Sequence, residues 1–290
     1  MRDGDSLYRF LFPELNVRGE VVHLDATWRA VLERHEYPAP VRRLLGEAMA
    51  AAALLTATIK LDGSLTLQIQ GEGPLHLLVV QCTSQRTLRG LARWKDAVPD
   101  GSLQEMVGDG RLVLTIDPGL GRERYQGVVE LSQATLSQAL EEYFSRSEQL
   151  PTRLWLTANA SRAAGLLLQN LPGEAADEDG WSRVEHLGAT ITDGELLELQ
   201  ASDLIRRLFH EEDVQLFDPE PVSFRCGCSR ERIEAVLRGL GHAEVQDILR
   251  EEGKIVVDCE FCNQHYEFDV VDAEQIFAGG VSPGVPQTRH

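Results

Sequence analysis

The sequence is poor in positive charge. Its 290 residues include 28 lysines and arginines against 46 aspartates and glutamates, which gives a formal net charge of −18 at pH 7. Only Lys60, Lys95 and Lys254 are lysines. Nucleic acids and anionic membranes repel an acidic protein, so we expect neither of them as the main partner.

Long apolar segments are also missing. The most apolar run, residues 48–59, has 12 residues including two threonines and is too short to span a bilayer. Residues 1–6 contain no apolar signal core. The glycine-rich segments 119–121 and 279–280 lack the lysine and the helix of a phosphate-binding loop. We therefore expect a cytoplasmic protein with no membrane or nucleotide partner.

The acidic residues gather in the middle of the chain. Residues 1–172 carry 20 acidic and 18 basic side chains, residues 173–222 carry 14 and 3, and residues 223–290 carry 12 and 7. This distribution predicts three regions with those boundaries: an N-terminal core domain, an acidic helical linker and a small C-terminal module. With 43% hydrophobic residues, the chain has enough apolar surface for a sizeable core.

The first region mixes helix and strand patterns. Because strands outnumber helices and do not alternate regularly with them, we predict an α+β fold rather than a doubly wound parallel sheet. The predicted helices are residues 27–35, 41–60 and 136–146, and the predicted strands are residues 64–70, 75–80, 88–94, 111–116, 125–131, 153–158 and 164–169.

The linker combines high charge with apolar stripes at helical spacing. Such helices are marginal alone and need a partner surface to stay folded. The stripes are either packed core in every state or a surface that unfolding releases for contact with other proteins, and the sequence leaves both interpretations open. The candidate residues are Trp181, Leu187, Leu197, Leu204, Leu208 and Phe209.

Four of the five cysteines form two close pairs near the C-terminus. Thirty residues separate Cys226-Gly-Cys228 from Cys259-Glu-Phe-Cys262. Four thiolates saturate the tetrahedral coordination of zinc and leave no position for water, which favours a structural or redox site over a hydrolytic one. We predict that these four cysteines bind one zinc ion per chain.

The residues around the cysteine pairs predict a module with a thin core. Helices are expected at residues 229–238 and 243–250, and strands at residues 254–258 and 266–270. Zinc can supply about 10–16 kcal/mol of folding free energy to such a module. In one interpretation, an oxidant reaches the thiolates, releases the metal and unfolds the module. In the other, the module is a static zinc ribbon whose thiolates never meet an oxidant. The spacing alone does not separate these two possibilities.

Several other functions and ligands are less consistent with the sequence. A nucleic-acid-binding zinc ribbon is rich in lysine and arginine, and residues 223–290 are acidic. A thiol–disulfide oxidoreductase places its cysteine pair at the start of a helix, whereas predicted strands flank Cys259 and Cys262. We interpret Cys82, at the end of an apolar strand pattern, as a buried structural thiol. His265 could compete as a ligand, but four cysteines already complete the site.

Several segments of this sequence resemble the heat shock protein 33 family of bacteria, the redox-regulated 33 kDa chaperonins. The cysteine-containing segments carry the most specific similarity: Phe224-Arg-Cys-Gly-Cys-Ser-Arg-Glu-Arg232 and Cys259-Glu-Phe-Cys-Asn-Gln-His-Tyr-Glu-Phe268. The other similar segments are residues 8–12, 17–20, 125–129, 143–152 and 163–172, so the resemblance extends over essentially the whole chain.

The resemblance implies an ATP-independent chaperone of the holdase type, not an enzyme. In the family the reduced, zinc-bound form is inactive. Oxidation to two disulfides, which residue matching places at Cys226–Cys228 and Cys259–Cys262, releases zinc and unfolds the module and linker. The exposed apolar surface then binds unfolding client proteins, and activated molecules form homodimers. The resemblance also implies a cytoplasmic location and an N-terminal α+β domain.

Overall fold

In the computed structural model the chain divides between Arg225 and Cys226 into two units, each with its own apolar core. The structure describes residues 4–59, 62–119, 122–173, 177 and 179–278. Where it is described, the acidic segment 173–222 lies within the first unit.

One sheet of the first unit is built around the N-terminal hairpin. Its strands follow the order β10-β1-β2-β9-β8, with β11 also paired to β1, and all of these pairings are antiparallel. The strands are β1 (Ser6–Phe12), β2 (Val17–Leu24), β8 (Thr152–Ala158), β9 (Ala163–Asn170), β10 (Gln215–Leu216) and β11 (Glu220–Pro221).

The second sheet has the order β12-β5-β4-β3-β6-β7. The short strand β12 pairs with β5 in parallel, and the other neighbours are antiparallel. Antiparallel neighbours joined by short connections confirm the predicted α+β class. The strands are β3 (Ser64–Gly71), β4 (Leu75–Thr83), β5 (Thr87–Trp94), β6 (Gly110–Asp117), β7 (Tyr125–Glu130) and β12 (Ser223–Phe224).

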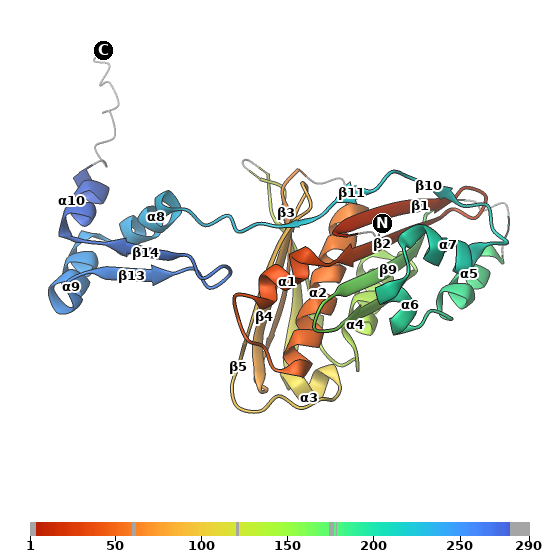
Figure 1. The fold of residues 1–290 in the computed structure, drawn as a ribbon, viewed down its shortest axis with the longest axis horizontal. Helices are drawn as coiled ribbons and strands as arrows, with labels where there is room; N and C mark the ends of the chain where they lie inside the picture. Colours follow the sequence, from red (N-terminus) through yellow and green to blue (C-terminus); the bar gives the residue numbers. More distant parts are fainter. Residues whose placement is uncertain (1–3, 60–61, 120–121, 174–176, 178, 279–290) are drawn as a thin grey trace, which may run out of the picture. The chain divides into compact units, whose positions relative to one another are not determined.

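The long helix α2 (Ala39–Thr58) packs against strands of both sheets (Figure 1). Its alanine-rich sequence favours the helix, and the small side chains of residues 50–53, all fully buried, allow close approach of its neighbours. The other helical elements around this core are α1 (Ala26–Leu32), α3 (Leu103–Val107), α4 (Leu136–Tyr143) and the π-helical turn η1 (Phe144–Glu148).

Three short helices of the linker cover the opposite face of the first sheet. They are α5 (Gly180–Gly188), α6 (Asp193–Glu198) and α7 (Ala201–Phe209), which Figure 1 shows together beside β1, β2 and β9. In β2, Val22 and Leu24 face the core around α2, whereas Val17 and Val21 face the linker helices. The first unit is therefore layered as sheet, helix, sheet and helices.

The second unit folds around a β-hairpin of β13 (Ile255–Asp258) and β14 (His265–Phe268). Helices α8 (Arg230–Leu240), α9 (His242–Glu252) and α10 (Val270–Ala278) pack around it. Its buried apolar core is small and consists of Leu237, Val245, Leu249, Ile255, Phe268, Ala273 and Ile276. A core of this size gives limited hydrophobic stabilisation.

The predicted helices and strands are found, with shifted ends, wherever the chain is described. The N-terminal strands β1 and β2 were not among them, because β2 is buried on both faces and shows no polar–apolar alternation. The strand predicted at residues 266–270 is wrong at its end, since the chain enters α10 at Val270. Among the described helices, none has the length and apolar character needed to cross a membrane.

Candidate metal centre

The first cysteine pair lies in the loop that leads into α8. Ser229, directly after Cys228, caps the helix: its hydroxyl accepts a hydrogen bond from the Arg232 backbone N–H at 3.4 Å. The Arg232 guanidinium reaches back and donates to the Gly227 carbonyl. These two hydrogen bonds attach the loop of Cys226 and Cys228 to the first turn of α8.

The second cysteine pair forms the turn of the β13–β14 hairpin. The Cys262 and Asn263 backbone N–H groups both donate to the Cys259 carbonyl, at 3.2 and 2.7 Å. Asn263 has a φ of +56°, a left-handed conformation that asparagine tolerates better than most residues. The Cys259 N–H donates to the Gln264 carbonyl at 3.0 Å and closes the turn. Both side chains thereby point to the same side of the turn.

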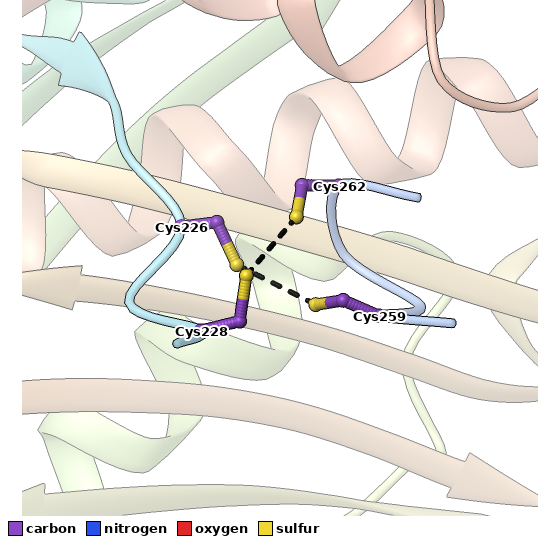
Figure 2. Close-up of side chains that lie close together, drawn as sticks. All are labelled: Cys226, Cys228, Cys259 and Cys262. Carbon is purple, nitrogen blue, oxygen red and sulfur yellow. Dashed lines mark hydrogen bonds between the residues drawn. The ribbon is translucent and has the colours of Figure 1, made fainter. Parts of the chain in front are cut away.

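The four sulfur atoms converge on one point (Figure 2). All four Sγ atoms lie within 4.8 Å of one another, with 3.6 Å between Cys226 and Cys259 and 3.3 Å between Cys228 and Cys262. A tetrahedral zinc site with Zn–S bonds of about 2.3 Å has sulfur atoms about 3.8 Å apart. The donor set and its spacing therefore fit zinc. Within the described part of the chain, no other group of three or more histidine, cysteine or acidic side chains has such spacing.

The thiols of the cluster differ in acidity. Burial opposes ionisation of Cys226, but hydrogen bonds from the Cys228 N–H and the neighbouring thiols outweigh it and lower the pKa of Cys226 to about 7. Burial raises the pKa of Cys259 and of Cys262. The Tyr266 hydroxyl donates a hydrogen bond to Cys228 Sγ at 3.2 Å. One thiolate is therefore readily available, and a bound cation would be needed to hold all four as thiolates at neutral pH.

The other two residues considered as ligands or thiols lie elsewhere. Cys82 is fully buried in β4 of the first unit, and burial raises the pKa of its thiol to about 11, which makes it unreactive. His265 begins β14 with its ring nitrogens 2.7 Å from Asp258 Oδ1 and 3.0 Å from Glu267 Oε1. It belongs to a surface ion-pair group and is absent from the sulfur cluster.

The six candidate apolar residues of the linker all belong to one buried cluster. Leu197, Leu204, Leu208 and Phe209 are buried, and Trp181 and Leu187 pack against them while half-buried. Their partners are strand residues that the sequence analysis did not single out, Phe10 and Phe12 of β1 among them. The sequence contained a signal for these partners, because the two phenylalanines are two residues apart and this spacing places both on one face of a strand.

Polar contacts add to this packing. His23 Nε2 lies 2.9 Å from the Leu196 carbonyl oxygen, and the Arg162 guanidinium donates to the Leu197 carbonyl at 2.9 Å. Arg153 forms an ion pair with Glu185 of α5 at 2.6 Å. The linker helices of the described structure are therefore held by both apolar and polar contacts to the sheet.

These features define a two-unit α+β protein whose smaller unit carries a four-cysteine centre suited to zinc. The family model described as Hsp33 protein matches residues 5–269. The chain belongs to the Hsp33 family.

Relatives that match this chain over their full length are named 33 kDa chaperonins. It is 57% identical over 290 residues to the "33 kDa chaperonin" of Nitrosococcus oceani and 47% identical over 293 residues to that of Methylobacillus flagellatus, with all of this chain and of each relative covered. The crystal structure of the 33 kDa chaperonin (heat shock protein 33 homolog) from Thermotoga maritima superposes with a TM-score of 0.81 at 25% identity. That superposition covers 96% of this chain and 99% of the Thermotoga chain.

Proposed function

We propose that this protein is a redox-regulated, ATP-independent chaperone of the holdase type. The observation that carries the proposal is the convergence of four thiol sulfurs, all within 4.8 Å of one another, in a unit with a thin apolar core. The relatives are named chaperonins, which supports a role in binding other proteins rather than in catalysis.

In the reduced state Cys226, Cys228, Cys259 and Cys262 hold one zinc ion per chain. Zinc binding links the hairpin turn to the loop before α8, two segments that contribute no side chain to the apolar core of this unit. The free energy of metal binding then becomes free energy of folding for the second unit. When bound, zinc keeps the four sulfurs as thiolates, the form that oxidants attack.

Oxidation removes the ligands in two steps of two electrons each. In each step two thiolates lose two electrons and form one S–S bond, while one hypochlorous acid takes up the electrons and yields chloride and hydroxide. Hydrogen peroxide gives two hydroxide ions in its place. The disulfides are Cys226–Cys228 and Cys259–Cys262. Disulfide sulfur is a poor zinc ligand, so the ion leaves and the second unit loses its main source of stability.

The linker unfolds as a consequence. Its three helices have nine, six and nine residues, too short to persist without the sheet they pack on. Release of α5–α7 exposes both sides of their apolar interface, which then binds unfolding proteins. The linker side includes Trp181, Leu187, Leu197, Leu204, Leu208 and Phe209.

The remaining parts of the proposal concern partners and location. We propose that the clients are unfolding proteins, that the activated chain forms a homodimer, and that it acts in the cytoplasm. The net charge of −18 supports such a role, because like charges keep a protein with exposed apolar surface in solution.

Zinc release and chaperone activity measured in the same sample test this function. The reduced protein is treated with hypochlorite while a chromogenic chelator reports the metal and light scattering reports the aggregation of an unfolding client. We expect about one zinc per chain to leave as aggregation is suppressed, and thiol reductant to reverse the suppression. Zinc that stays bound, or that leaves without a gain in activity, would mean a static structural site.

A further inference from the structure

Apart from the cysteine cluster, the structure contains a pocket of about 500 Å³ in the first unit, which is large enough for a small molecule. It is lined by residues at the end of α2, by β3 and β6, and by the π-helical turn η1. Its volume falls within the range of small-molecule sites, and π-helical turns within helices often occur at functional sites. The apolar lining includes Leu55, Ile59, Leu65, Leu114, Ile116 and Phe144.

A single arginine lies among these apolar side chains. The Arg18 guanidinium, half-buried, donates to Gln169 Oε1 from Nε at 3.0 Å and from Nη2, and to the Thr58 carbonyl from Nη1 at 3.0 Å. Gln169 is itself fully buried and is fixed by donating to Thr152 Oγ1 at 2.7 Å. The position of Arg18 is therefore set by the fold, and two of its five N–H groups have no acceptor among the described residues.

The charge of Arg18 has no partner of opposite sign in the described part of the chain. No carboxylate there lies within 4.0 Å of its guanidinium nitrogens, although ion pairs are recorded for many other arginines. Glu20, two residues along β2, does not neutralise it: burial raises the pKa of Glu20 to about 8, so its carboxyl is mostly protonated at neutral pH. A desolvated cation beside apolar surface is costly unless an anion pairs with it.

We propose that this pocket binds a small amphipathic monoanion, a carboxylate on an aliphatic body, with the carboxylate on Arg18 and the body against the apolar lining. The two remaining N–H groups of Arg18 suit a carboxylate through charge-assisted hydrogen bonds. The site is distinct from the cysteine cluster, since all of its lining residues belong to the first unit.

The open end of the pocket selects against a second negative charge. Glu148 lines the pocket, is exposed, and accepts hydrogen bonds from the hydroxyls of Tyr143 at 2.8 Å and Tyr125 at 3.2 Å. A ligand with a carboxylate at each end would bring one of them to Glu148. The ligand therefore carries its charge at one end only.

Calorimetric titration of the reduced full-length protein with octanoate tests the proposal. We expect one octanoate per chain, with 1-octanol, octylamine and octanedioate each binding at least about ten-fold more weakly. The first two lack the carboxylate that Arg18 requires, and octanedioate places its second carboxylate near Glu148. Since the protein stays reduced throughout, the result is independent of whether oxidation activates it.

Two variants locate the site. Arg18→Gln should weaken octanoate binding about ten-fold or more, and Ser147→Trp, an exposed position on η1, should block the pocket without altering the core. The matched control is Arg250→Gln in α9, whose side chain is 73% exposed and remote in sequence, and which should bind octanoate as the wild type does.

Three results would overturn the proposal. These are the absence of octanoate binding to the wild type, 1-octanol binding as tightly as octanoate, and unchanged octanoate binding in Ser147→Trp. The last two would mean non-specific apolar contact. Thermal unfolding establishes whether Arg18→Gln is folded, and if it is not, Ser147→Trp and the ligand series decide the question alone.

Discussion

The rings of Phe12 in β1 and Phe209 in α7 meet edge to face, with centroids 5.1 Å apart and planes at 86°. Phe10 also packs near Phe209, at 6.0 Å, and lies 5.6 Å from Phe12, so the three rings form one triangular cluster. Phe209 is only 1% exposed and, together with the buried Leu204 and Leu208, attaches the last linker helix to the first sheet. Edge-to-face aromatic pairs add to the free energy of area burial, so this contact strengthens the attachment of α7.

Phe209→Ala should weaken the attachment of the linker. Removing a buried phenylalanine costs about 3–5 kcal/mol, comparable to the stability expected of a few short helices docked on a sheet. We expect hydrogen exchange to accelerate in α5–α7 and client aggregation to be suppressed without oxidant. The matched control is Phe217→Ala, since Phe217 is 42% exposed and should leave both measurements unchanged. Equal basal activity in wild type and Phe209→Ala would show that docked linker helices do not restrain the chaperone.

Cys259→Ser should reduce the zinc content and loosen the second unit even in reductant. Three thiolates and a hydroxyl bind zinc less tightly than four thiolates, and the small core of this unit does not compensate. Metal analysis and limited proteolysis after residue 226 measure the two effects. Cys82→Ala is the control, because Cys82 lies in the first unit and outside the cluster. Wild-type zinc content with wild-type protease resistance in Cys259→Ser would contradict the four-thiolate site.

Tyr266→Phe should make the cluster react faster with oxidant. The Tyr266 hydroxyl donates to Cys228 Sγ, and a donated hydrogen bond withdraws electron density from a thiolate and lowers its nucleophilicity. We expect zinc release by peroxide to accelerate several-fold, with zinc stoichiometry unchanged before oxidation. Tyr125→Phe, which removes a hydroxyl from the first unit, should release zinc at the wild-type rate. A slower release from Tyr266→Phe would reverse the assigned role of this hydrogen bond.

Glu20→Gln should change how stability of the first unit depends on pH. Glu20 is 2% exposed, its Oε2 has no hydrogen-bond partner among the described residues, and burial raises its pKa from 4.5 to about 8. The folded state therefore binds more protons than the unfolded state between those values, and its stability falls as pH rises, by at most about 1.4 kcal/mol per pH unit.

Urea unfolding followed by tryptophan fluorescence measures this effect. All four tryptophans lie in the first unit, so the signal reports on that unit alone. We expect Glu20→Gln to be more stable than the wild type at pH 8 and to show a flatter pH dependence. Glu47, whose pKa burial raises to about 7, keeps part of the slope. Glu14→Gln, at an exposed position, should follow the wild-type curve.

Local sequence patterns were sufficient for most elements and for the four cysteines that the fold brings together. Strands such as β3 and β6 alternate polar and apolar residues because only one of their faces is buried, and that pattern is visible in one sequence. The cysteine spacing singled out the four side chains that the structure clusters, because closely spaced cysteine pairs are a typical arrangement for zinc binding. In both cases the signal lies in residues that are close together in the sequence. They are alternate strand positions in the first case and the two members of each cysteine pair in the second.

Long-range features could not be predicted in this way. The pairing of Gly19 with Phe10 brings the phenyl ring over a position where a Cβ atom would lie 2.1 Å from it. Such contacts join residues whose distance in space is set by the whole fold.

The chain that leads from α7 to Cys226 has a consequence for solubility. Through β10 and β11 it occupies the open side of β1, and through β12 that of β5, so residues 215–224 shield strands of both sheets. An uncovered strand offers its free N–H and C=O groups to any other extended chain and invites aggregation. Ten residues that precede the cysteine cluster in sequence thus help to keep the protein from pairing with its own copies.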